Sequence, residues 1–154
     1  MKYTEWKEAR QQEFNKLPIF YAFGEKQFGE QLAKRGIDRK DAPKLIVSIG
    51  AGGFCLKQDV SAVKAFLEKD TEAELRAMME ADLNFAFDAF EYEMFNHEYP
   101  INWEGDYDVC SCFGGVDFSE DKYGKDYLKD LGFSDQVVKV YYKAAKKVQE
   151  AIEW

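Results

Sequence analysis

The spacing of apolar residues predicts helices over most of this chain. Apolar side chains recur every three or four positions, as on one face of a helix, over residues 3–17, 25–35, 59–69 and 134–152. The tetrapeptide Thr71-Glu72-Ala73-Glu74 has the residues of a capping box and predicts a long helix from residue 71 to about residue 96. This helix could also be continuous with the one before it. Another helix is predicted to begin at Ser119 and end at Gly132.

Two short apolar runs predict a β-hairpin. Residues 45–49 are rich in β-branched side chains, residues 54–56 form the returning strand, and the glycine-rich residues 50–53 supply the turn. Residues 19–23 are either a buried strand or an irregular core segment. Residues 97–118 are expected to be irregular, with a short strand over residues 108–113 as one option.

These elements together indicate the fold class. Helices predominate, and the predicted strands suffice only for a small antiparallel β-hairpin or sheet. The chain has 154 residues and contains no linker or repeat, so residues 1–154 are expected to form a single domain. The sequence therefore predicts a mostly helical α+β domain.

Negative charge is concentrated in one stretch of the chain. Between Glu68 and Asp121 there are sixteen acidic and two basic residues, a net charge of −14, whereas both flanking segments are net positive. The isoelectric point near 4.8 argues against direct binding to nucleic-acid phosphates, which requires clustered basic residues. Because concentrated charge bears mainly on the choice of partner, we expect a partner with a basic surface.

The composition also limits the location of the protein. No apolar run approaches 18 residues, so no membrane span or membrane partner is expected. The polar N-terminus lacks the apolar segment of a secretory signal. The three cysteines are few and odd in number, which argues against a disulfide framework. We therefore expect a reduced, cytoplasmic protein.

The cysteines and the single histidine offer candidate metal ligands. Cys110 and Cys112 lie two residues apart, His97 follows the predicted long helix, and Cys55 could complete a set of four. Their spacing matches no common zinc pattern, so no cofactor is predicted. Small buried thiols and a histidine that interacts with the last helix carbonyls are the alternative interpretation. A catalytic Cys–His pair would require the two side chains to be adjacent in space.

Carboxylates on the predicted long helix and in the loop after it form a candidate partner-binding surface. Carboxylates at successive helical turns rise by about 6 Å, close to the phosphate spacing along a nucleic-acid strand, and an exposed aromatic side chain beside them could anchor a partner. The predicted surface consists of Glu80, Asp88, Glu91, Phe95, Glu98, Glu104, Asp106 and Asp108. The alternative is a solvated face that lysines elsewhere in the chain neutralise, among them Lys139, Lys143 and Lys146.

Three sequence motifs carry a family resemblance. They are FEYEMFNHEY at residues 90–99, LGF at residues 131–133 and SIGAGGF at residues 48–54. In these motifs the chain resembles small acidic proteins of unknown function from bacterial phages and mobile elements. The resemblance implies a bacterial host cell as the setting, in which small acidic proteins often block host nucleases. It implies no catalytic role for any residue.

The function expected from these observations is non-enzymatic. The protein would inhibit a host nucleic-acid-binding defence protein, as anti-CRISPR and anti-restriction proteins do, by presenting its carboxylates to a basic surface. One alternative is a metal-dependent enzyme or metal-binding module that uses His97, Cys110 and Cys112. Another is a homo-oligomeric scaffold, for example a homodimer, built through the apolar seam from Val138 to Ile152.

Overall fold

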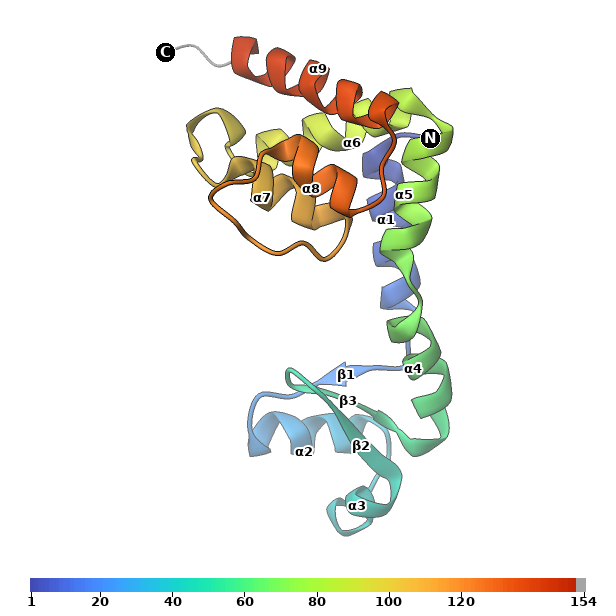
Figure 1. Cartoon of the computed structure of the whole chain (residues 1–154). Coiled ribbons are helices and arrows are strands. Elements are labelled where there is room, and N and C mark those ends of the chain that lie inside the picture. The colour runs from blue at the N-terminus through green and yellow to red at the C-terminus, as the bar shows by residue number, and fades with distance from the viewer. Residues whose placement is uncertain (152–154) are drawn as a thin grey trace. The chain divides into compact units, whose positions relative to one another are not determined.

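The computed structural model describes residues 1–151, which group into two compact units (Figure 1). The hairpin unit comprises Arg10–Lys69, and the helical unit comprises Met1–Ala9 together with the chain from Asp70 onward. Helices predominate and one small antiparallel sheet accompanies them, which confirms the predicted fold class. The single domain expected over residues 1–154 stays a prediction. Within residues 1–151, no helix has the length and apolar character needed to cross a membrane.

The hairpin unit is built around a three-stranded antiparallel sheet. The strands are β1 (Phe20–Tyr21), β2 (Ile46–Gly50) and β3 (Gly53–Leu56), in the order β1-β3-β2. The β2–β3 hairpin was predicted, and residues 19–23 prove to contribute the third strand. Besides the end of the first helix of the chain, this unit contains the α-helices α2 (Glu25–Lys34), the short α3 (Ala42–Leu45) and α4 (Val60–Glu68).

Backbone conformation at the hairpin turn and aromatic packing explain this local fold. Gly50, Ala51 and Gly52 have φ values of 89°, 51° and 78°, so two of the three left-handed positions are occupied by glycine, which tolerates them best. Phe28 of α2 packs against Phe54 of β3, with ring centroids 5.0 Å apart. This contact attaches α2 to the sheet (Figure 1).

The helical unit carries the main hydrophobic core. It contains the first residues of α1 (Tyr3–Asn15) and helices α5 (Thr71–Ala81), α6 (Leu83–Asn96), α7 (Gly105–Cys110), α8 (Gly124–Asp130) and α9 (Asp135–Ala151). Helices α6 and α9 pack against each other. At the centre, the buried ring of Phe90 meets Tyr141 edge-to-face at 5.0 Å and Phe113 at 5.2 Å.

The single long helix predicted over residues 71–96 is wrong, because the chain breaks at Asp82. This residue has extended backbone angles (φ −140°, ψ 103°), and its carboxylate accepts hydrogen bonds from the backbone N–H groups of Asn84 (3.0 Å) and Phe85 (3.2 Å). An aspartate that caps a helix in this way satisfies otherwise unpaired N–H groups. Asp82 therefore separates α5 from α6, and Glu80 does not share a helix with the other predicted carboxylates.

Two local predictions for the segment after α6 are also wrong. Residues 108–113 form no strand; they belong to α7 and to a 3₁₀ turn, Ser111–Phe113, because Val109, Cys110 and Phe113 fall on one buried side at helical spacing. Ser119 does not begin a helix. Its carbonyl accepts the hydroxyl of Tyr127 at 3.0 Å, and α8 begins only at Gly124.

The apolar seam of the last helix is used inside the helical unit. Of the predicted seam, Tyr141, Ala145 and Val148 are buried on α9, the helix that packs against α6, and Val138 is partly buried against the same core. Ile152, the last member of the predicted seam, lies outside the described residues. The predicted homo-oligomer stays a prediction, but the described part of this seam is no longer available to support it.

Candidate functional site

A carboxylate, an imidazole and a thiol converge beside the end of α6. Glu93 and His97 lie one turn apart at the end of this helix, and Cys112 comes from the 3₁₀ turn Ser111–Phe113. Cys112 Sγ lies 3.0 Å from Glu93 Oε2 and 3.4 Å from His97 Nε2, and the last two atoms are 3.4 Å apart. We call these three residues the Glu–His–Cys cluster. Among residues 1–151 it is the one group of three or more His, Cys, Asp or Glu side chains close enough to share a metal ion.

The other oxygen of Glu93 is held by residues of α1. Glu93 Oε1 accepts hydrogen bonds from Lys7 Nζ at 3.0 Å and from the Tyr3 hydroxyl at 3.2 Å. The carboxylate is buried, so these donors are needed to compensate its lost hydration. They fix the carboxylate with Oε2 directed to His97 and Cys112.

In the metal-free cluster, the pKa values of Glu93 and Cys112 are shifted in opposite directions. Burial opposes ionisation of Glu93, but hydrogen bonds from Cys112, Lys7 and Tyr3 together hold the pKa of its carboxyl below its usual range. Burial and the hydrogen bond to Glu93 raise the pKa of the Cys112 thiol to about 12. The cluster therefore contains an ionised carboxylate that accepts a hydrogen bond from a neutral thiol.

This arrangement does not suit a Cys–His nucleophile. A catalytic histidine uses one ring nitrogen for the nucleophile and the other for the orienting carboxylate. Here Nε2 of His97 faces both Cys112 and Glu93. A thiol with a pKa of about 12 is also almost entirely protonated at neutral pH, and the thiolate is the nucleophilic form.

The raised pKa of Cys112 predicts a loss of stability in alkali for the metal-free protein. A group whose folded pKa exceeds its unfolded value of about 8.5 contributes fully below that pH and loses its contribution as pH rises through the folded pKa. We expect the free energy of unfolding, measured in urea, to fall between about pH 8.5 and 10. For Cys112→Ala, the free energy of unfolding should fall less steeply with pH. An equal slope in the two proteins would contradict the assigned environment of this thiol.

Of the other sequence candidates for metal binding, neither thiol joins the cluster. Cys110 is the buried last residue of α7, with Sγ 4.0 Å from the carbonyl oxygen of Gly124, and burial raises its pKa. Cys55 belongs to β3 of the hairpin unit. Glu93 was not among the candidates predicted from the sequence, although a Glu and a His four residues apart on a helix face the same side, and this spacing could have identified the pair.

The predicted partner-binding carboxylates of α5 and α6 have partners within the helical unit. Glu80 accepts the backbone N–H and the hydroxyl of Ser134, at 2.6 and 2.8 Å, and so supports the start of α9. Asp88 accepts the backbone N–H of Tyr3 at 2.6 Å. Glu91 pairs with Lys147 at 2.7 Å. Part of the negative charge is thus neutralised within the helical unit. The lysine that does this is Lys147, which was not among the three lysines named from the sequence.

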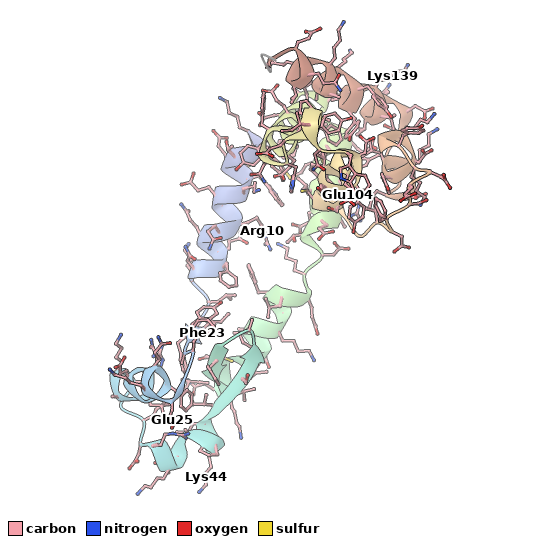
Figure 2. All side chains as sticks on the ribbon, turned by 90° about the vertical axis from the view of Figure 1, so that its left-hand side faces the viewer. Arg10, Phe23, Glu25, Lys44, Glu104 and Lys139 are labelled. Atoms are coloured by element: carbon pink, nitrogen blue, oxygen red, sulfur yellow. The ribbon has the colours of Figure 1, made fainter. Side chains whose placement is uncertain are left out.

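The remaining predicted carboxylates differ in their surroundings. Asp108 accepts the side-chain amide of Asn102 at 2.8 Å, and Asp106 accepts two tyrosine hydroxyls. Glu98 is exposed, and the ring of Phe95 is 48% exposed on α6. Glu104, labelled in Figure 2, lies immediately before α7 and lines a surface pocket.

Asp106 has a structural role that the charge pattern did not indicate. Its Oδ1 accepts the hydroxyls of Tyr99 at 2.8 Å and of Tyr141 at 2.5 Å. Asp106→Asn should destabilise the protein by about 1–3 kcal/mol, because the amide is a weaker acceptor and brings an NH₂ group without a matching partner. Urea unfolding measures this cost. The exposed Asp117→Asn is the control, and equal midpoints for the two variants would contradict the role assigned to Asp106.

Comparison with known proteins identifies the family of this chain. No curated protein and no solved structure matches it. The model of a family of unknown function, DUF7659, matches residues 2–147, which include the whole Glu–His–Cys cluster. The chain therefore belongs to this family of unknown function.

Proposed function

We propose that the protein is a zinc-binding module whose metal site is the Glu–His–Cys cluster. The observation that carries the proposal is the convergence of Glu93 Oε2, His97 Nε2 and Cys112 Sγ from two separate elements. Carboxylate, imidazole and thiolate are all zinc ligands, and the soft thiolate disfavours magnesium and calcium. This proposal refines the metal-binding alternative from the sequence by replacing Cys110 with Glu93.

The distances within the cluster support a tetrahedral ion. Zinc lies about 2.3 Å from sulfur and about 2.0–2.1 Å from nitrogen or carboxylate oxygen, so tetrahedral ligand atoms are about 3.3–3.6 Å apart. The two distances from His97 Nε2 are both 3.4 Å, and the Cys112–Glu93 distance is 3.0 Å. Binding would require only the thiol–carboxylate pair to separate, by about 0.5 Å, once the thiol proton is lost.

The surroundings of the cluster also fit a metal site. Ligands in metal sites are oriented by hydrogen bonds from residues that do not touch the ion, and Lys7 and Tyr3 provide these for Glu93. The thiolate and carboxylate would together balance a divalent cation. The side chain of His97 is 31% exposed, so solvent reaches the cluster. Three protein ligands leave a fourth position for water, as in zinc sites that perform catalysis.

Zinc titration of the metal-free protein tests this function. The protein should compete with a chromophoric chelator for one equivalent of Zn²⁺, and an excess of Mg²⁺ should not displace it. Bound zinc should also raise the unfolding temperature, because the ion binds only the folded site. Absence of both stoichiometric binding and a thermal shift would remove the proposal.

A second candidate function is the acidic interaction protein expected from the sequence. The observation that favours it is the exposed ring of Phe95, which lines a shallow pocket of about 390 Å³ on α6 together with Tyr92, Asp88 and Glu91. An exposed aromatic beside carboxylates suits a basic protein partner. In the proposed phage or mobile-element setting, that partner would be a host nuclease of a CRISPR or restriction system.

The interaction function has a test of its own. Binding to a candidate nuclease should weaken steeply as salt concentration rises, since exposed charges are screened. Phe95→Ala should weaken binding and leave the fold intact. Affinity that does not change with salt, or with this substitution, would exclude the α6 surface as the contact.

A further inference from the structure

A second surface pocket in the helical unit combines aromatic rings with carboxylates. It has a volume of about 330 Å³, at the lower end of the range of small-ligand pockets. Its walls come from the segment before α7, from α7, from the segment leading into α8 and from α8 itself. Its aromatic residues are Trp103, Tyr107, Phe118, Tyr123 and Tyr127.

The aromatic rings are arranged as adjacent walls. Phe118 meets Trp103 at an interplanar angle of 84° and Tyr107 at 79°, with ring centroids 6.5 and 5.4 Å apart. Rings at right angles do not stack face to face, so they leave a space between them that a ligand can enter. Trp103 is 82% exposed, so its indole is open to a ligand. The faces of aromatic rings attract cations.

The charged residues in the lining also favour a cationic ligand. Glu104, Asp106 and Glu120 line the pocket. Within residues 1–151, the carboxylates of Glu104 and Glu120 have no hydrogen-bond or ion-pair partner. The lining also contains Lys122, but Asp130 pairs with its Nζ at 2.7 Å. The pocket therefore retains an excess of negative charge.

We propose that this pocket binds the guanidinium group of an arginine side chain presented by a protein partner. A planar guanidinium donates in pairs to carboxylates and also stacks on aromatic rings, so it uses both features of the lining. A quaternary ammonium group has no N–H to offer to Glu104 and Glu120. A lysine ammonium lacks the planar face. None of the pocket residues belongs to the Glu–His–Cys cluster or lines the α6 pocket beside Phe95, so the inference depends on neither of these two sites. Glu104 and Asp106 do belong to the partner-binding surface predicted from the sequence.

Three matched peptides test the assignment on the full-length chain. Each carries one central residue between glycines: arginine, its neutral isostere citrulline, or lysine. The readout is the NMR signal of the Trp103 indole N–H, identified by its loss in Trp103→Ala, with the indole of Trp6 as internal reference. The arginine peptide should shift this signal saturably. The citrulline peptide should bind at least about tenfold more weakly, since it lacks the charge that the ring faces attract, and the lysine peptide should lie between them.

Variants separate this pocket from the other acidic surface. Trp103→Ala and Glu120→Gln should each weaken binding of the arginine peptide by roughly three- to thirtyfold, whereas Phe95→Ala should leave the affinity unchanged. Backbone NMR signals follow the binding in these variants. The replaced residues are exposed, so the fold should persist. Equal binding of the arginine and citrulline peptides would overturn the inference. So would a loss of affinity in Phe95→Ala that Trp103→Ala does not share.

Discussion

Cys112→Ser is expected to lower the zinc affinity of the protein by about a hundredfold or more. Structural zinc sites bind their ion with about 10–16 kcal/mol over four ligands, or roughly 3 kcal/mol per ligand, which corresponds to about a hundredfold in affinity. The serine hydroxyl can still donate to Glu93, 3.0 Å from the present sulfur, so the metal-free fold should be retained. Competition with a chromophoric chelator at fixed pH measures the effect.

A neighbouring thiol provides the matched control. Cys110→Ala removes a cysteine only two residues away whose sulfur lies near the carbonyl of Gly124, outside the cluster. Its zinc affinity should stay within about threefold of the unmodified protein. His97→Gln, which removes the imidazole, should behave like Cys112→Ser. A loss of affinity in Cys110→Ala that Cys112→Ser does not show would place the metal elsewhere.

Phe90→Ala is expected to destabilise the helical unit by about 3–5 kcal/mol. The ring is fully buried and packs edge-to-face against Tyr141 at 5.0 Å and Phe113 at 5.2 Å. Its removal leaves a cavity between α6 and α9 as well as the lost transfer free energy. Urea unfolding followed by far-ultraviolet circular dichroism measures the change. The loss is a large part of the 5–15 kcal/mol that typically stabilises a domain.

The same helix supplies the control for this substitution. Phe95 is 48% exposed on α6, and Phe95→Ala should change the free energy of unfolding by no more than about 0.5 kcal/mol. Both variants replace phenylalanine by alanine, so a difference in their stability reports the difference in burial. If both variants unfolded at the same urea concentration, Phe90 would not be the buried centre of the α6–α9 core.

Local patterns were sufficient to predict the secondary structure where one signal dominated. The β2–β3 hairpin followed from a β-branched run and glycines placed at left-handed positions. The break at Asp82 was missed because apolar periodicity continues across it and a single aspartate overrides the pattern. The helix at Gly105–Cys110 was missed because six residues give too few turns for the period to be recognised.

The candidate site could be predicted only in part from the sequence. His97 and Cys112 were named as metal candidates because of their chemistry. The long-range contact that joins them depends on how α7 and its 3₁₀ turn fold back onto α6, which residue spacing does not encode. Charge counting likewise could not show that Glu80, Asp88 and Glu91 accept hydrogen bonds or pair inside the helical unit.

The absorption spectrum of the protein with Co²⁺ in place of zinc is the sharpest test of a metal site at the Glu–His–Cys cluster, because it reports ligand type and geometry together. With Glu93, His97 and Cys112 as ligands, we expect intense visible d–d bands, typical of a tetrahedral site, and a near-ultraviolet thiolate-to-cobalt charge-transfer band at one equivalent of metal. Cys112→Ser should lose the charge-transfer band, whereas Cys110→Ala should keep it. A spectrum identical to that of aqueous cobalt, or a charge-transfer band that persists in Cys112→Ser, would contradict a metal site built from Glu93, His97 and Cys112.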